Sequence, residues 1–170
     1  KSIDAAILSR EQEEPSVTVE GNFHRAIRLA DEHGSSRHKF IARYQFCWTL
    51  FWWFEDFKQF VETYPATENI CIGINAVDCL EKLLTLWQLL TNIRRENKSL
   101  IPEKDYISYT ERLKEELYKI QNNNYAPSSA LYVELLSTQL ELSLRINNGK
   151  DIEDIISKFE NILDKSEGLP

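Results

Sequence analysis

Helical periodicity is the feature that most limits what this chain can fold into. Apolar residues recur every three or four positions over most of its length, as in Phe40, Tyr44 and Trp48. Only Ser16 to Glu20 alternates with the period of a strand, and that run is short and isolated. Glycine and proline number five each, fewer than a turn-rich β fold uses. The sequence therefore predicts an all-α fold.

Capping and breaking residues divide the chain into six or seven expected helices. We expect a short helix over 3–10, a polar linker over 11–20, and helices over 23–33 and 37–64. Further helices are expected where Thr67 caps a segment with its apolar face over 74–93, where Pro102 and Pro127 open segments, and where Asp151 caps the last one.

Several residues are expected to mark the helix ends. Gly34 should end the second helix, and Ser35 or Ser36 should cap the third. Pro65 should stop the third helix, because proline removes a backbone donor. Further along, Asn122 to Asn124 should end a helix. Gly168 should end the final helix, in which Asp154 follows Asp151 at capping-box spacing.

The expected architecture is an antiparallel helical bundle or a short α-helical repeat, because short links join the helices. We expect residues 1–21 to be a short helix with a polar linker and residues 22–170 to form a single all-α domain. The chain begins at Lys1 and has no methionine, so we also expect a processed product or a piece of a longer chain.

The core is expected where helices are apolar nearly all round. Residues 46–54 fit this description and should lie at the centre of the fold. We expect Trp48, Phe51 and Trp87 to be core residues, and we interpret the stripe with Trp52 and Trp53 as core rather than as a ligand platform. The last helix should bury one face made by Ile152, Ile155, Ile156, Phe159, Ile162 and Leu163.

The net charge and the cysteines indicate which kinds of partner and which cellular compartment to expect. The net charge of −7 disfavours nucleic acid as a partner, and no apolar run is long enough for a membrane span. Cys47, Cys71 and Cys79 lie in apolar helical runs, which indicates buried free thiols in a reducing, cytoplasmic setting. No residue pattern indicates a cofactor or a metal.

One basic stretch departs from the acidic average. Residues 24–43 hold all three histidines, and a Gly34-Ser-Ser turn there precedes a helix N-terminus that could hold an anion. The alternative is an ordinary solvated basic face. The candidate anion- or partner-binding residues are Arg25, Arg28, His33, Arg37, His38 and Arg43.

The spacing from Arg28 to His33 resembles the Arg-x4-His signature of HEPN ribonucleases, which are helical bundles. That resemblance implies that Arg28 contacts phosphate and that His33 acts in acid–base cleavage of RNA. The sequence departs from the family at Leu29, where a polar residue is usual, and in the early position of the motif.

The C-terminal segment resembles one helix–turn–helix unit of a tetratricopeptide repeat. The unit consists of residues 129–146, the Asn147-Asn-Gly149 turn and residues 152–164. Residues 54–65 have a similar spacing of aromatic residues, as at the end of such a unit. By this resemblance Ile155, Phe159 and Ile162 follow the pattern of the second helix, although Ile155 and Ile162 replace small residues of the family. The family implies a partner-binding surface. An ordinary antiparallel helix pair is the alternative.

These observations favour a non-enzymatic domain that binds another protein as a scaffold or adaptor. The sequence contains no GxxxxGK, no HExxH and no nucleophile elbow. The alternatives are a HEPN-like ribonuclease and a structural or dimerisation domain that pairs as a homodimer.

Overall fold

The computed structural model describes residues 1–74, 76–122 and 126–167, and over these ranges it contains helices and turns but no strand. Eight α-helices follow one another: α1 (Ser2–Glu11), α2 (Ser16–His33), α3 (Ser36–Trp52), α4 (Phe57–Ile72), α5 (Val77–Glu96), α6 (Glu103–Asn122), α7 (Pro127–Asn147) and α8 (Glu153–Glu167). The all-α prediction is confirmed, and the described residues hold more helices than the six or seven expected.

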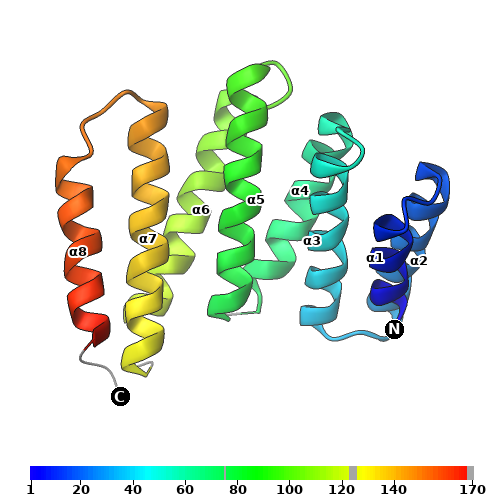
Figure 1. Ribbon diagram of the computed structural model, residues 1–170, viewed down its shortest axis with the longest axis horizontal. Coiled ribbons are helices and arrows are strands. Elements are labelled where there is room, and N and C mark those ends of the chain that lie inside the picture. Colours follow the sequence, from blue (N-terminus) through cyan, green and yellow to red (C-terminus); the bar gives the residue numbers. More distant parts are fainter. Residues whose placement is uncertain (75, 123–125, 168–170) are drawn as a thin grey trace.

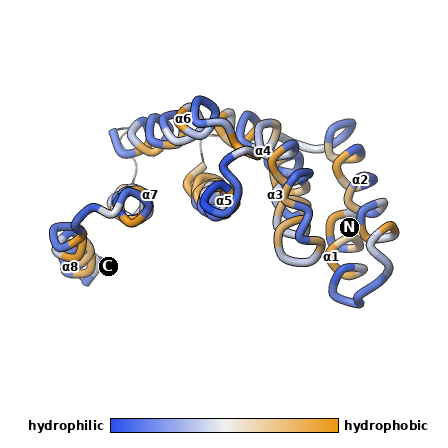
Figure 2. Tube along the Cα trace, turned by 90° about the horizontal axis from the view of Figure 1, so that it is seen from above, coloured by the Kyte–Doolittle hydropathy of each residue, from blue (hydrophilic) through white to orange (hydrophobic). Residues whose placement is uncertain are grey.

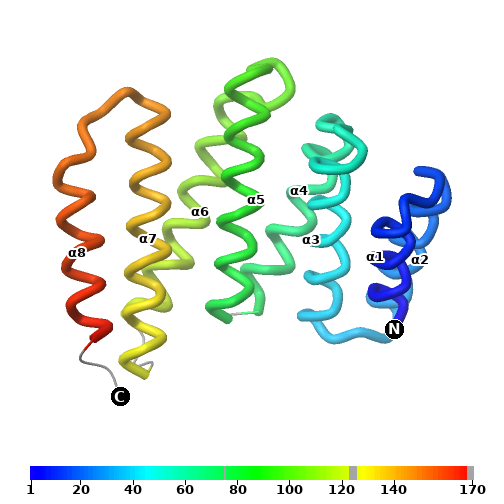
Figure 3. The backbone as a smooth tube through the Cα atoms, in the orientation of Figure 1, coloured from blue at the N-terminus to red at the C-terminus, as the bar shows by residue number. Residues whose placement is uncertain are grey.

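The helices form an elongated row of antiparallel neighbours, with the two ends of the chain at opposite ends of the row (Figures 1 and 3). Helices that pack extensively are consecutive in the chain, or are odd-numbered helices two places apart such as α3 and α5. Seen from above, α2, α4 and α6 form one layer and α1, α3, α5 and α7 form another (Figure 2). The row bends, so that α1 and α8 both lie to the side of α5 away from α6.

The core runs along this row and is densest around α5. Trp87 of α5 is fully buried, its indole Nε1 donates a 3.0 Å hydrogen bond to the Thr110 hydroxyl, and its ring stacks on Tyr106 at 5.8 Å. The prediction that Trp87 is a core residue is confirmed. Trp48 and Phe51 were also predicted to be core residues, but they are only partly buried.

The prediction of a single helix over 37–64 is wrong, because a turn separates α3 from α4. Glu55 takes a positive φ of 51°, and the Asp56 carboxylate caps α4 by accepting a 2.9 Å hydrogen bond from the Gln59 amide. The apolar run was expected to be buried all round, yet Trp52 and Trp53 lie exposed at the end of α3.

Pro65 does not stop a helix, as had been expected; it lies inside α4. Thr67 likewise caps no helix, because it is buried within α4 and its hydroxyl donates to the Thr63 carbonyl at 3.0 Å. The helix continues through the proline because Tyr64 and Glu68 on either side of it are fully buried against neighbouring helices. Packing therefore outweighs one missing backbone hydrogen bond.

The polar linker is shorter than predicted, because α2 begins at Ser16. Pro15 sits just before it with φ −51°, an angle suited to the start of a helix. Val19 and Phe23, four residues apart, are both buried, so the core stripe of α2 starts a turn earlier than expected. Ala6 of α1 belongs to the same core cluster.

The predicted boundary between the second and third helices is confirmed. The Ser35 hydroxyl caps α3 by accepting from the His38 amide, and Gly34 ends α2. A Cβ at Gly34 would lie 2.6 Å from the Ala30 carbonyl oxygen, so any larger residue would clash with backbone. The predicted breaks at Asn123, Asn124 and Gly168 lie outside the described residues.

The three cysteines are buried and free, as predicted. Burial raises the pKa of the Cys47 thiol to about 12, and the Cys71 thiol donates to the Cys79 carbonyl at 3.2 Å. Within the described ranges, no helix combines the length and the apolar character needed to cross a membrane.

Candidate functional site

Helices α7 and α8, at one end of the row, carry apolar side chains that are not fully buried. The buried apolar side chains of α7 are Val133, Leu136 and Leu140. A different stripe, which includes Leu135 and Leu142, is only half-buried. Helix α7 thus carries apolar residues on two sides, and only one of them belongs to the core.

Helix α8 contradicts the prediction that it buries a whole apolar face. Ile155 and Ile162 are buried against α7, but Ile156 and Leu163 are 51% and 61% exposed. The physical reason is that α8 is the last described helix and packs extensively only on α7. A helix with one neighbour covers about half of a wide apolar face.

Leu163 lines a groove between α7 and α8 with a volume of about 460 Å³, and Ile156 lies two turns away on the same side of α8. The groove is lined by Ser128, Leu131, Tyr132, Leu135, Phe159, Ile162, Leu163 and Ser166. Ser137, which borders α6, lies two positions beyond Leu135, or about 200° around the helix. The groove therefore opens on the side of α7 that faces away from α6.

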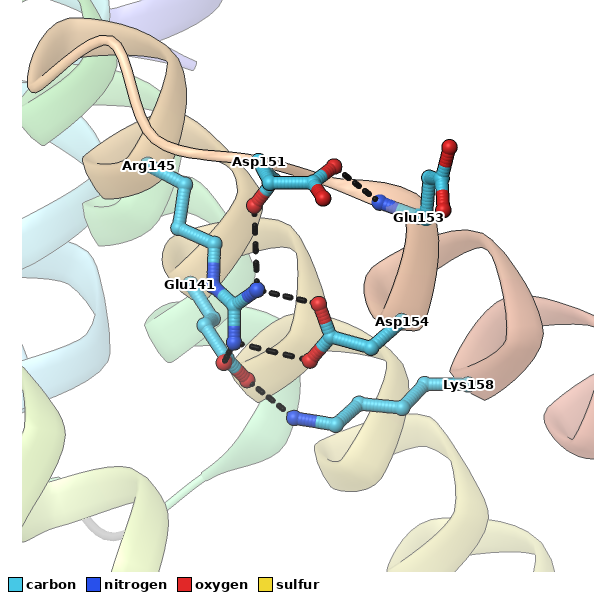
Figure 4. Close-up of polar contacts among 6 residues, drawn as sticks. All are labelled: Glu141, Arg145, Asp151, Glu153, Asp154 and Lys158. Atoms are coloured by element: carbon cyan, nitrogen blue, oxygen red, sulfur yellow. Dashed lines mark hydrogen bonds and ion pairs between the residues drawn. The ribbon is translucent and has the colours of Figure 1, made fainter.

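The opposite side of the α7–α8 contact is held by ion pairs (Figure 4). The Arg145 guanidinium donates to Glu141 at 2.7 Å, to both oxygens of Asp154 and to the Asp151 carbonyl at 3.0 Å. Lys158 donates to the second oxygen of Glu141 at 2.6 Å. Because Lys158 lies two positions after Ile156, it projects about 200° away from the exposed apolar stripe.

The charges of this network support one another. Hydrogen bonds from Lys158 and then Arg145 hold the pKa of Glu141 below its ordinary value, and Arg145 does the same for Asp154. Nearer the C-terminus, Lys165 donates to both oxygens of Glu134, at 2.8 and 3.0 Å. The network fixes the angle of α8 on α7, so the groove on the other side has a defined shape.

An acidic stripe follows the exposed apolar stripe along α8. Glu153, Glu160 and Glu167 are exposed and seven residues apart, which places them on one side of the helix. Glu160 lies only about 40° around the helix from Ile156 and about 60° from Leu163. In the part of the chain that the structure describes, the ion pairs of α8 use other residues, so these three carboxylates face solvent.

The basic stretch does not form one concentrated site. Arg43 makes two hydrogen bonds with Asp31, at 2.9 and 2.7 Å, and Arg37 reaches Asp78 of α5 at 2.5 Å. His38 shares a 2.9 Å hydrogen bond with the Ser35 hydroxyl. These contacts engage half of the six candidates within the chain.

The other three candidates are exposed on α2: Arg25, Arg28 and His33. His33 lies 3.6 Å from Glu32. Since Arg28 and His33 are five positions apart on one continuous helix, their side chains diverge by about 140°. The structure therefore does not bring the two residues of the HEPN-like motif together within one chain. Nor do the described residues hold a group of three or more His, Cys, Asp or Glu placed for a metal ion.

A buried polar cluster links α4 to α6, and the sequence analysis missed it. Glu68 is fully buried and pairs with Arg112, whose guanidinium lies 5.3 Å over the Tyr109 ring. Burial raises the pKa of Glu68 to about 7, although Arg112 opposes this shift. One Glu68 oxygen and the Tyr64 hydroxyl are buried and have no hydrogen-bond partner among the described residues. The 44 positions between Glu68 and Arg112 leave no local signal of the pair.

No protein-family model matches this chain, and no curated protein or solved structure is significantly similar to it.

Proposed function

We propose that this chain is a non-enzymatic protein-interaction module, a row of tetratricopeptide-like helix pairs whose α7–α8 groove holds an amphipathic helix of a partner protein. The observation that carries the proposal is the apolar groove lined in part by the exposed Leu163, with the exposed Ile156 two turns away on the same side of α8. Contiguous exposed apolar surface on an otherwise polar protein is typical of an interaction site.

A helix fits this groove better than a strand does. The backbone groups within α7 and α8 are engaged in their own helices, so the groove has no strand edge to extend. Ile156 and Leu163 are seven residues apart, or two helical turns, which matches the anchor spacing of a helix lying alongside. The partner would supply apolar residues at positions i, i+3 or i+4, and i+7.

The acidic stripe indicates the charge of that partner. Glu153, Glu160 and Glu167 run beside the apolar stripe, so a docked helix would place one of its edges against three carboxylates. Lysine or arginine along that edge would complement them, whereas acidic residues would be repelled. The net charge of −7 adds long-range attraction for a basic segment.

The same stripe argues against a second copy of this chain as the occupant. Two copies related by twofold symmetry would bring their own acidic stripes close together. Sedimentation at increasing protein concentration separates the two cases. A dimer that disappears in the Leu163→Asp variant would assign the groove to self-association and overturn the proposal of a separate partner.

Designed helical peptides test the groove directly. One peptide carries leucine at i, i+4 and i+7 with a lysine edge, and its binding is measured by fluorescence anisotropy. Ile156→Asp and Leu163→Asp should each weaken binding at least tenfold, since burying one aliphatic side chain contributes about 1.5–3 kcal/mol. Ile107→Asp on α6 is the matched control, because Ile107 is also half-exposed but lies far from the groove.

A charge-reversed variant tests the partner's edge. Replacing Glu153, Glu160 and Glu167 by lysine should weaken binding of the lysine-edged peptide and strengthen binding of a matched glutamate-edged peptide. Added salt should weaken the original pair, because exposed charges are screened over about 8–10 Å. Peptides that bind equally well to the groove variants and to the unmodified protein would overturn the proposal, provided that circular dichroism shows all variants folded.

A further inference from the structure

A second surface, away from the groove, lies where α3 turns into α4. Trp52 and Trp53 are 54% and 47% exposed there, and Phe57 at the start of α4 is also exposed. Indole rings are costly to leave in water, and exposed tryptophans are enriched at interaction sites. The aromatic stripe was expected to lie in the core, but the exposure of Trp52 and Trp53 favours the alternative of a ligand platform.

The Trp52 ring is held in place from behind. Trp48 lies 5.8 Å from it along α3, and Phe51 lies 4.9 Å from it with an edge-on geometry. Phe51 in turn contacts Phe60, which is fully buried, at 6.0 Å. Trp52 is therefore a fixed platform with one side supported by the core and the other open.

Aromatic rings in this protein already accept guanidinium groups. The Arg10 guanidinium lies 4.3 Å over the neighbouring Trp53 ring, and Arg94 lies 4.6 Å over Tyr106. Such contacts arise because the face of an aromatic ring is electron-rich. In the described residues Trp52 has no cation of this kind over its ring, although it is the more exposed of the two tryptophans.

The charges in the turn favour a cation at this position. Between Trp53 and Phe57 the charged residues are Glu55 and Asp56, both acidic and exposed. Asp56 is used as the cap of α4, whereas Glu55 makes no ion pair among the described residues. Acidic residues in the turn directly after Trp52 add electrostatic attraction for a positive group.

We infer that Trp52, supported by Trp48 and Phe51 and followed by the acidic turn that contains Glu55, is a binding site for an arginine or lysine side chain of a basic segment in a protein partner. The cation stacks on the open indole face while Glu55 supplies the opposite charge. The site lies on α3 and shares no residue with the α7–α8 groove, so it stands or falls independently of the function proposed for that groove.

The probe is an acetylated tetra-arginine amide, compared with the same peptide carrying citrulline, which keeps the shape of arginine and lacks its charge. The four indole N–H signals of the protein are followed by NMR as each peptide is added. The arginine peptide should shift the Trp52 signal progressively, and the citrulline peptide should shift it far less.

Variants then locate the effect. Trp52→Ala should weaken binding of the arginine peptide about two- to fivefold, which corresponds to the loss of one exposed cation–π contact. Glu55→Gln should also weaken binding of this peptide. Tyr118→Ala on α6 is the matched control, because Tyr118 is an exposed aromatic residue on another helix. It should leave the affinity unchanged.

Three results would overturn this inference. Equal shifts with both peptides would show an apolar surface rather than a cation site. Undiminished affinity in Trp52→Ala would place the peptide elsewhere. A blue-shifted tryptophan emission with phosphatidylcholine vesicles, without a response to the arginine peptide, would assign the exposed indoles to lipid.

Discussion

At the scale of single residues, Glu68 has the most unusual environment. Its carboxyl group is fully buried and pairs with Arg112 from another helix. Removing a carboxylate from water costs free energy, and the raised pKa of about 7 indicates that this cost exceeds the attraction of Arg112. Glu68 is therefore a residue at which the fold is sensitive to pH.

The Glu68→Gln variant tests this sensitivity. A group whose pKa is higher in the folded state stabilises the fold below its ordinary pKa, near 4.5, and this contribution is lost as the pH rises to about 7. The free energy of unfolding of the unmodified protein should therefore fall relative to Glu68→Gln between pH 4.5 and 7. Urea titrations at several pH values measure it. If the unmodified protein instead gains stability relative to Glu68→Gln as the pH rises, the attraction of Arg112 dominates.

Trp87 shows how much a buried aromatic contributes. Trp87→Ala should lower the free energy of unfolding by about 3–5 kcal/mol, the usual cost of removing a large core side chain. Thr110→Val should cost about 1–3 kcal/mol, because it leaves the buried indole N–H without its acceptor. Chemical denaturation measures both variants. A loss below 1 kcal/mol for Trp87→Ala would contradict its place in the core.

The two residues also show where sequence reasoning ends. Trp87 lies on a stripe with Leu80 and Leu84, so its burial could be predicted from spacing alone. Glu68 lies in a polar stretch of α4 between Thr67 and Asn69, and its burial depends on where α6 packs. Contacts between distant segments leave no periodic trace in one sequence.

At the scale of helices, α4 contains the clearest exception to a local rule. Pro65 lies in its ninth position, where the missing N–H and the ring cost a helix about 3 kcal/mol. Pro65→Ala should therefore raise the free energy of unfolding, by up to roughly 3 kcal/mol. Pro127→Ala is the control, since Pro127 begins α7 where its N–H would have no helical partner, and little change is expected. A destabilised Pro65→Ala variant would mean that the proline itself contributes to the stability of the fold.

The errors in predicting the helices have a common physical origin. Local rules correctly placed the Ser35 cap and the end of α2 at Gly34, because those signals act within one turn. They failed at Pro65 and at α8, where neighbours decide the outcome. The apolar face of α8 was read correctly as apolar, but spacing cannot show that only one helix is present to cover it.

At the scale of the whole molecule, stability should vary along the row. Helix α5 packs on α3, α4, α6 and α7, whereas α8 packs extensively only on α7. Amide hydrogens of α5 should therefore exchange most slowly, and those of α8 much faster, because local opening needs less free energy where fewer contacts are broken. Hydrogen exchange with mass spectrometry measures this gradient. Equal protection along the chain would show that the row opens as one cooperative unit.

The neighbour-only pattern of packing also has a consequence for how the chain reaches its fold. Each helix meets partners one or two places away, so assembly closes only short stretches of chain and loses little loop entropy at any step. Proteins rich in such local contacts fold in microseconds to milliseconds. Several helix pairs could act as starting points, and a chain emerging from the ribosome could complete its first pairs before its last helices are made.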